Sequence, residues 1–318
     1  MKHIFIINPQ AGKFSAEQTV REALAAHPEY DTEVYLTEHS GDATRYIKDY
    51  CRKHPDLDVR FYACGGDGTI NEVAEGVYQC PRASMSCYPC GSGNDYVKYF
   101  GGRERFLSVA DLLCAEEQRV DLMKIGDRVA VNVANFGFDS CVAKTMHRVR
   151  RKKIIGGKNA YTTGIVVALC KAMRTKCTVY ADGQPINPKG KLLLCTVSNG
   201  KYVGGSFCCA PYSDNADGLL ELCLVRPVSR LTFIRLVRTY AKGEHLGNHK
   251  FAKFISYLRC KEVVIDSPDP EFSLCIDGEM KDATHFEISV LPSALRFAIP
   301  RAEATVSETD EASELQPV

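Results

Sequence analysis

The alternation of strand-like and helix-like segments along the first 117 residues constrains the fold of this chain more than any other feature. Short apolar runs typical of buried strands alternate with stretches whose apolar residues recur at helical spacing. The strand-like runs cover residues 3–8, 32–37, 59–63 and 84–88. This order predicts an α/β domain with a mainly parallel sheet, whose ligand crevice lies beyond the carboxyl ends of the strands.

Two of these strands end in glycine-rich loops, at residues 65–69 (GGDGT) and 91–95 (GSGND). Glycine lets the backbone approach a ligand closely, and successive N–H groups can converge on phosphate oxygens. A helix predicted to begin near Ile70 favours negative charge, and Thr69 and Glu72 have the spacing of a capping box. The loops therefore predict a rigid phosphate cradle, with a plain strand-to-helix turn as the alternative. Neither loop completes a Walker A motif or the G-x-G-x-x-G pattern.

Polar residues near these strand ends are candidate ligand contacts. Asp67 and Asp95, one in each glycine loop, could organise Mg²⁺ and phosphate or cap the turns. Asn8 and Gly12, after the first strand, could touch a nucleotide or simply shape that turn. Asp121 interrupts a strand-like stretch, and a carboxylate there is more often exposed on a strand face than functional.

Composition indicates a globular protein with a hydrophobic core. A length of 318 residues suggests roughly two domains, and 45% hydrophobic with 25% charged residues is typical of such proteins. The net charge of +1 gives no overall attraction to nucleic acid. Fifteen cysteines scattered through apolar runs suit reduced cytosolic thiols better than a disulfide framework. The first apolar run is too short for a signal peptide and no run reaches membrane-spanning length, so we expect a cytoplasmic protein, at most peripheral to the inner face of the membrane.

After residue 126 the pattern changes to strand-like runs separated by turn residues. These runs cover residues 129–138, 177–180, 191–198, 219–225, 262–266, 272–276 and 286–291. Asp-Gly pairs between several of them are typical of tight turns between antiparallel strands. We therefore expect a second, mostly antiparallel domain with helices near 159–174 and 229–242. The acidic tail at 301–318 lacks periodicity and is expected to be disordered.

Two clusters of basic residues lie in the second half of the chain. One spans residues 144–158, and the other comprises Arg235, Arg238 and Lys242 on a predicted helix. Either could dock on anionic lipid head groups, where each basic residue near the surface is worth about 1 kcal/mol. A solvated helix face is the alternative. Nucleic acid is not expected as a partner, because no recognition motif accompanies the charge.

Taken together, these motifs resemble the diacylglycerol kinase catalytic family, in particular the soluble bacterial lipid kinases with their sphingosine kinase-like relatives. The two glycine loops carry most of the specificity, and the other motifs follow in the order typical of the family. They are Asn8-Pro9 with Gly12, Asp121 with Lys124, residues 135–139 (NFGFD), Asp217-Gly218 and residues 277–279 (DGE).

The resemblance covers residues 1 to about 300 and implies two domains. The first is an NAD kinase-like (Rossmann-like) α/β domain at residues 1–126. The second is a mostly antiparallel β-sandwich at residues 127–294 that receives the lipid. Residues 295–300 would return to the first domain, and the active site would lie in the cleft between the two.

The resemblance also assigns roles along the nucleotide. The residues expected to line it are Asn8, Gly12, Gly65, Gly66, Gly68, Thr69, Ser92, Gly93 and Asn94. Asp67, Asp95 and Asp121 would belong to a polar network that holds Mg²⁺ and phosphate. Lys98 stands where many relatives carry arginine, which would change the geometry of one phosphate contact.

In the second domain, Asp277 resembles the general base of the family, with Glu279 as its acidic neighbour. On the residues alone, Asp-Gly at this place is as readily a two-residue hairpin turn. A second, structural metal would be held by Asp214, Asp217 and a nearby backbone carbonyl, for which Leu219 is the candidate.

The function implied by the resemblance is an ATP- and Mg²⁺-dependent lipid kinase, with diacylglycerol the expected acceptor and phosphatidic acid the product. NAD kinase shares the GGDGT element and is one alternative, although GSGND, DGE and the β-sandwich pattern speak against it. A non-catalytic nucleotide- or lipid-binding protein on the same scaffold is another. The lipid would be met at the membrane surface, and an exposed sheet edge could pair two subunits as a homodimer.

Overall fold

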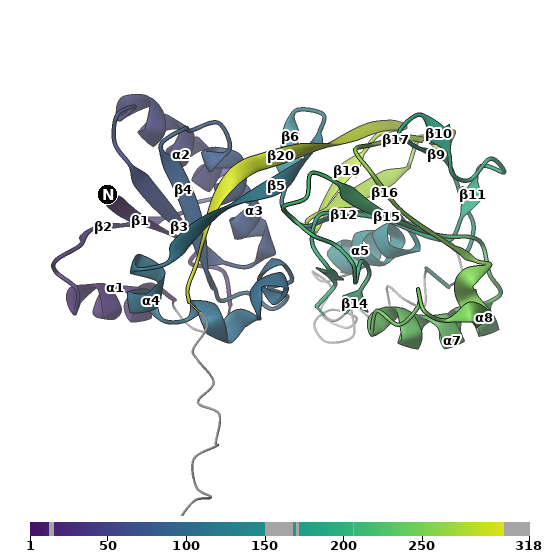
Figure 1. Ribbon diagram of the computed structural model, residues 1–318, viewed down its shortest axis with the longest axis horizontal. Helices are drawn as coiled ribbons and strands as arrows, with labels where there is room; N and C mark the ends of the chain where they lie inside the picture. Colours follow the sequence, from purple (N-terminus) through teal and green to yellow (C-terminus); the bar gives the residue numbers. More distant parts are fainter. Residues whose placement is uncertain (13–15, 150–167, 170–171, 206, 302–318) are drawn as a thin grey trace, which may run out of the picture.

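The computed structural model describes residues 1–12, 16–149, 168–169, 172–205 and 207–301 (Figure 1). Two lobes lie side by side, and two long strands run from one lobe into the other (Figure 1). These strands are β5 (Glu116–Ile125) and β20 (His285–Ile299), which pair antiparallel. Most of the helix expected at 159–174, the basic residues at 150–153 and 158, and the tail from 302 lie outside the described residues.

The first lobe is the predicted α/β domain with a parallel sheet. Its parallel strands are ordered β4-β3-β1-β2. Its elements in chain order are β1 (Lys2–Ile7), α1 (Ala16–Ala25), β2 (Asp31–Leu36), α2 (Asp42–Lys53), β3 (Val59–Gly65), α3 (Asp67–Val77), β4 (Ala83–Pro89), the 3₁₀ turns η1 (Tyr96–Phe100) and η2 (Arg103–Phe106), and α4 (Val109–Leu113). Strands β3 and β4 are buried at every residue, as expected for a parallel sheet covered by helices. β2 forms the edge of this sheet, and pairing of two subunits there stays a prediction.

The second lobe is antiparallel and rich in β-structure, as predicted. Its main sheet has the order β16-β15-β12-β7-β18-β19 and faces β9, β17 and β20 across a hydrophobic core. Helices α5, α7 and α8 lie along the outer side of the main sheet (Figure 1). Its elements are β6 (Arg128–Ala130), β7 (Val133–Gly137), α5 (Phe138–Val149), β8 (Thr175–Lys176), β9 (Thr178–Ala181), β10 (Gln184–Pro185), β11 (Lys191–Leu192), β12 (Leu194–Ser198), β13 (Tyr202–Val203), β14 (Phe207–Cys208), β15 (Leu220–Val225), α7 (Arg230–Ala241), α8 (His249–Ala252), β16 (Ile255–Cys260), β17 (Glu262–Asp266), β18 (Ser273–Ile276) and β19 (Glu279–Asp282).

The two lobes share one continuous sheet. β20 pairs with β17 in the second lobe, then with β5, and reaches β4 of the first lobe where Phe297 lies beside Met85. Its register against β5 shifts between Leu291 and Leu295. The segment expected to return to the first domain is therefore the last part of one long strand. Strands this long couple the positions of the two lobes, because moving one lobe would require the shared sheet to bend.

Two local expectations are wrong. The run at 129–138 is not one strand, because β6 and β7 are separated and α5 begins at Phe138, directly after Gly137 with a φ of +89°. Helix α3 begins at Asp67, and among the described residues no side chain caps it, so Thr69 and Glu72 do not form a capping box. Glu72 instead accepts a hydrogen bond from Ser40 at 3.3 Å.

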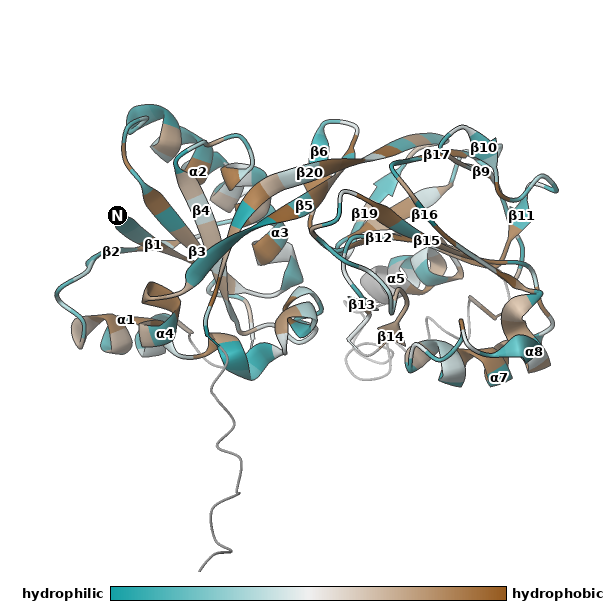
Figure 2. Ribbon diagram, in the orientation of Figure 1, coloured by the Kyte–Doolittle hydropathy of each residue, from teal (hydrophilic) through white to brown (hydrophobic). Residues whose placement is uncertain are grey.

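Hydropathy along the chain agrees with this arrangement. Apolar residues follow the strands and the inward faces of the helices, and polar residues gather on the outer turns (Figure 2). Within the described residues, no helix is long and apolar enough to cross a membrane.

Candidate active site

The glycine loops of the first domain pack backbone against backbone. A Cβ atom on Gly91 would lie 2.4 Å from Cα of Gly66, and one on Gly12 would lie 2.4 Å from the carbonyl oxygen of Cys90. Gly12 also has a φ of +81°, which favours glycine. The N–H groups of Cys90 and Gly91 donate to the carbonyl oxygen of Gly65 at 2.9 and 3.2 Å. Larger residues are therefore excluded, and the loops form one rigid backbone surface.

The other residues predicted to line the nucleotide surround this surface. Asn8 donates from Nδ2 to Oγ1 of Thr69 at 3.3 Å, which joins the first turn to the start of α3. No atom lies within 4 Å of where a Cβ of Gly68 would stand, so that residue faces open space. Ser92 is exposed, whereas Asn94 is buried and its Oδ1 has no hydrogen-bond partner in the described structure. A buried oxygen of this kind is a candidate ligand contact.

Asp67 joins the two glycine loops. Its Oδ1 accepts hydrogen bonds from the backbone N–H groups of Asp95 at 2.7 Å and Tyr96 at 3.3 Å. Its Oδ2 lies 2.7 Å from where a Cβ of Gly93 would stand, and it accepts no hydrogen bond from the residues that the structure describes. Burial and then the neighbouring charge of Asp95 raise the pKa of Asp67. One oxygen therefore fixes the loops while the other is free for a ligand.

Asp95 reaches the second domain. Both of its carboxylate oxygens lie 3.0 Å from the backbone N–H of Gly205, and Lys98 donates to Oδ1 at 2.6 Å. The same ammonium group donates to the carbonyl oxygen of Gly205 at 2.6 Å. Asp95 and Lys98 therefore hold the loop after β13 against the GSGND loop. The lysine that departs from the family pattern is engaged in this contact between domains.

Asp277 occupies the tip of the hairpin between β18 and β19. The φ angles of Asp277 and Gly278 are +45° and +90°, as in the two-residue turns that Asp-Gly favours. The carboxylate accepts hydrogen bonds from the N–H groups of Val131 and Val133, each at 2.8 Å. Loss of hydration, opposed by these hydrogen bonds and reinforced by the charge of Asp67, raises the pKa of Asp277 to about 6. Asp277 is thus both part of the hairpin turn and the candidate general base.

Asn71 connects Asp277 to the first domain through a hydrogen bond. With the amide nitrogen facing its acceptors, Nδ2 donates to Oδ2 of Asp277 at 3.1 Å and to the carbonyl oxygen of Val129 at 3.3 Å. Asn71 is 2% exposed and lies about one turn after Asp67 on α3. The candidate base therefore faces the helix that starts at the glycine loop. Sequence reasoning missed Asn71, and its spacing from Asp67 was the only signal.

Glu279 forms an ion pair with an arginine that also reaches the first domain. Arg128 of β6 donates to Glu279 at 2.8 Å and lies 3.5 Å from Glu75 of α3. The guanidinium thus bridges a second-domain hairpin and a first-domain helix. This contact supports the position of Asp277, two residues away, and a catalytic role for Glu279 stays a prediction.

Asp121 is 1% exposed, in contrast to the exposed strand position that its sequence context favours. Its Oδ1 accepts from the N–H of Ser293 and its Oδ2 from the N–H of Gly218, both at 2.7 Å. Its backbone N–H donates to Asn215, and its carbonyl oxygen accepts from Nδ2 of Asn199. Asp121 therefore ties β5 to β20 and to the loop before β15. Its expected place in the Mg²⁺ and phosphate network stays a prediction.

Two family models match most of the chain. The model described as "Diacylglycerol kinase catalytic domain" matches residues 2–125. The model described as "YegS C-terminal NAD kinase beta sandwich-like domain" matches residues 132–299, more than half of the chain. The chain belongs to the diacylglycerol kinase catalytic family. The two matches are separated by residues 126–131, directly after the end of β5, while the proposed domain boundaries stay predictions.

Relatives of the family agree with this assignment. A diacylglycerol kinase of Bacillus subtilis (strain 168) is 27% identical over 94% of this chain and 96% of its own. A protein of Serratia proteamaculans (strain 568) named "Probable lipid kinase YegS-like" is 31% identical over 93% of both chains. The crystal structure of a diacylglycerol kinase from Bacillus anthracis str. Sterne has a TM-score of 0.67 at 21% identity over 94% and 96% of the two chains, which supports the fold. The chain is therefore a lipid kinase, an enzyme that phosphorylates a lipid alcohol.

A lipid kinase implies a nucleotide with a divalent cation, and the glycine loops fit that pair. The free Oδ2 of Asp67 and the unpartnered Oδ1 of Asn94 are oxygen donors, which Mg²⁺ prefers. Among the described residues, no group of three or more His, Cys, Asp or Glu side chains forms a closed metal site. A cation at the loops would therefore share its coordination with phosphate oxygens, as Mg²⁺ commonly does in kinases.

The loop expected to hold a structural metal already gives both aspartates protein partners. Asp214 accepts a hydrogen bond from the hydroxyl of Tyr99 at 3.3 Å. Asp217 accepts through Oδ1 from the N–H of Leu219 at 2.9 Å, and its Oδ2 is paired with the guanidinium of Arg259. A cation there would have to displace Arg259. The loop as folded does not present an open set of donors, and the structural metal stays a prediction.

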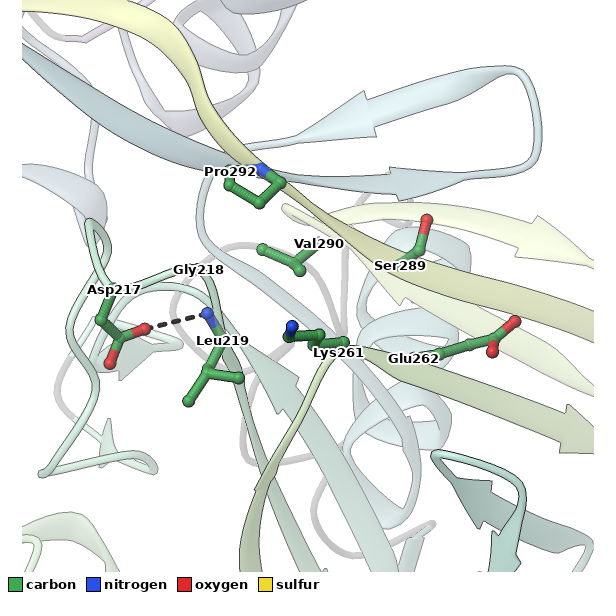
Figure 3. Close-up of a pocket in the computed structure, with 8 residues that line it drawn as sticks. All are labelled: Asp217, Gly218, Leu219, Lys261, Glu262, Ser289, Val290 and Pro292. Atoms are coloured by element: carbon green, nitrogen blue, oxygen red, sulfur yellow. Dashed lines mark hydrogen bonds between the residues drawn. The ribbon is translucent and has the colours of Figure 1, made fainter.

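A cavity of about 640 Å³ lies beside the same loop (Figure 3). Asp217 and Leu219 line one side of it, Val290 and Pro292 of β20 line another, and Lys261 lies between them (Figure 3). All of its lining residues lie outside the glycine loops and the Asp277 hairpin. This cavity is therefore distinct from the candidate active site.

Proposed function

We propose that this lipid kinase transfers the terminal phosphate of ATP to the free hydroxyl of diacylglycerol, in a Mg²⁺-dependent reaction that yields phosphatidic acid and ADP. The observation that carries the proposal is the contact of Asn71 with Asp277. This contact holds the carboxylate of Asp277, whose pKa is raised, opposite the backbone surface that the glycine loops of the first domain form. A base on one side and a phosphate cradle on the other are what phosphoryl transfer to an alcohol requires.

The phosphate chain of ATP would lie along the glycine loops. Backbone N–H groups of residues 65–69 and 91–95 and the amino end of α3 would donate to its oxygens, with no side chain in the way at Gly68. Asp67 and Asn94 would hold Mg²⁺, which neutralises phosphate charge when bound. Because the loops are packed together, this surface is organised before the nucleotide arrives.

Asp277 would accept the proton of the attacking hydroxyl. The hydroxyl oxygen forms a bond to the γ-phosphorus, the bond from that phosphorus to the β–γ bridging oxygen breaks, and the proton passes to the carboxylate of Asp277. A pKa of about 6 leaves the carboxylate mostly deprotonated at neutral pH and more basic than an ordinary aspartate. The N–H groups of Val131 and Val133 keep the carboxylate in place during the transfer.

The test is a phosphotransfer assay with ATP and Mg²⁺ across diacylglycerol, monoacylglycerol, sphingoid bases, prenols and NAD. We expect diacylglycerol to have the highest kcat/KM. Preference for another lipid would replace the acceptor but keep the mechanism. Transfer to NAD alone, or nucleotide binding without any transfer, would overturn the proposal.

A further inference from the structure

Helix α7 carries exposed apolar side chains among basic ones. Leu231 is 70% exposed and Ile234 is 51% exposed, and they are two of only five large apolar side chains exposed in the described structure. Helix α7 lies in the outer layer of helices that covers the main sheet of the second lobe (Figure 1). The opposite face of α7 is anchored, because Phe233, Leu236 and Tyr240 are buried.

The exposed arc of α7 contains only basic and apolar long side chains. At 100° per residue, Ile234, Leu231 and Arg238 fall near its centre, and Arg230 and Arg235 fall at its two margins. No acidic residue occurs within α7. We call these five residues, together with Lys242 at the end of the helix, the α7 surface.

The charge around this surface is strongly one-sided. Residues 226–253 contain seven lysines and arginines and one acidic residue, Glu244, in a chain whose net charge is +1. Arg235, Arg238 and Lys242 are exposed and form no ion pair with an acidic side chain of the described residues. A partner that binds this surface would have to offer negative charge to the basic residues and an apolar environment to the exposed leucine and isoleucine.

We propose that the α7 surface docks this enzyme on an anionic lipid bilayer. Leu231 and Ile234 would enter the boundary between head groups and acyl chains, and the basic residues around them would contact anionic head groups. A nucleic acid or an acidic peptide would satisfy the arginines but leave both apolar side chains in water. The inference rests on the proposed function in one respect, which is that the acceptor lipid lies in that bilayer.

The test is sedimentation of the full-length protein with vesicles of phosphatidylcholine alone and of phosphatidylcholine with phosphatidylglycerol. We expect binding to the mixed vesicles that weakens as salt is added. Leu231→Ser with Ile234→Ser should reduce the partition coefficient roughly tenfold or more. Arg235→Gln with Arg238→Gln should reduce it by about 25-fold, since each basic residue near the surface contributes about fivefold.

Matched controls are Lys48→Gln with Lys53→Gln on α2, which removes two exposed charges from the first domain, and Leu57→Ser, which removes an exposed leucine there. These controls should bind vesicles like the unaltered protein. Absence of binding to the mixed vesicles, equal binding to neutral ones, or unchanged binding of the α7 variants would overturn the proposal. A dimer in sedimentation velocity that dissociates in the α7 variants would also overturn it, because the surface would then face a second copy.

A kinase assay separates this inference from the proposed function. With diacylglycerol dispersed in detergent, the α7 variants should keep the turnover of the unaltered enzyme, whereas with diacylglycerol in mixed vesicles they should lose about as much activity as they lose binding. If the unaltered protein binds the vesicles but phosphorylates no diacylglycerol in either form, the proposed acceptor fails and the docking surface stands.

Discussion

The glycine loops and the domain junction each contain an aspartate that accepts two backbone hydrogen bonds, but the bonds are distributed differently. Asp67 takes both on Oδ1 and keeps Oδ2 free. Asp121 takes one on each oxygen, from segments that are far away in the sequence. The first arrangement fixes a carboxylate and leaves it able to bind a ligand, whereas the second uses the whole carboxylate to join strands. The distribution of hydrogen bonds therefore distinguishes an aspartate that keeps one oxygen for a ligand from one whose two oxygens both join segments of the protein.

Asp277 accepts hydrogen bonds on both oxygens, as Asp121 does, but its raised pKa and its contact with Asn71 make it the candidate base, so its replacement should have the largest effect. Asp277→Asn removes the proton acceptor, and general bases typically contribute about 10²–10⁴-fold to the rate. Initial rates of phosphate transfer from ATP measure the loss. The asparagine keeps one oxygen for Val131 but turns an NH₂ group toward the N–H of Val133, so we expect a modest fall in thermal stability with the fold retained.

Two outcomes would contradict this prediction. Turnover near that of the unaltered enzyme would remove Asp277 from the proton transfer. Loss of the folded state would show that the hairpin contact is mainly structural. Nucleotide binding by the variant distinguishes loss of the proton acceptor, which leaves binding intact, from loss of the fold, which abolishes it.

The comparison itself can be tested with one substitution made at both aspartates. Asn in place of Asp67 can still accept both N–H groups through its single oxygen, so stability should hardly change while turnover falls. Asn in place of Asp121 must face either Ser293 or Gly218 with its NH₂ group, and one buried N–H left unpaired costs about 1–3 kcal/mol. Denaturant unfolding of the two variants measures the difference. Equal losses of stability would mean that the distribution of hydrogen bonds is not what separates them.

The sequence predicted the parts of this fold that depend on local pattern. Alternation of buried strands and helices was sufficient for the parallel sheet, and Asp-Gly between two strands was sufficient for the hairpin of Asp277. The burial of Asp121 was not predictable, because its partner Ser293 lies 172 residues away and strand periodicity does not reveal which face a distant strand will cover. The role of Asn71 was not predicted, for a similar reason. Its spacing from Asp67 is visible in the sequence, but its partners Val129 and Asp277 come from the second domain and are not.

The capping box failed because tertiary partners outweighed local spacing. Thr69 bonds Asn8 of the first turn, and Glu72 bonds Ser40, so neither side chain turns back to the helix start. The glycine loop was correctly placed, but its rigidity comes from contacts between loops rather than from a cap.

The pKa of Asp277 should appear as a pH dependence of smaller size. Burial raises this pKa to about 6, so the carboxylate is protonated and inactive below that pH. We expect kcat to rise about tenfold per pH unit up to roughly pH 6 and to level off above it. Nucleotide affinity measured over the same range is the control. A flat rate profile, or one that simply follows nucleotide affinity, would contradict the assignment.

The smallest effect is expected at Arg259, which gives a third arrangement of carboxylate partners. Its guanidinium pairs with Asp217 and with Glu221, so the loop predicted to hold a structural metal is neutralised from within. Thermal unfolding of the unaltered protein without nucleotide should therefore be insensitive to Mg²⁺ or to a chelator. Arg259→Gln frees the carboxylate of Asp217, and Mg²⁺ should then stabilise the variant by about 0.4 kcal/mol at a concentration equal to its Kd. Arg52→Gln on α2, which breaks an exposed ion pair with Asp49, is the control and should gain no response to Mg²⁺.

If instead a chelator lowers the unfolding temperature of the unaltered protein, a cation already outcompetes the guanidinium, and the loop belongs with Asp67 among the sites that keep an oxygen for a ligand.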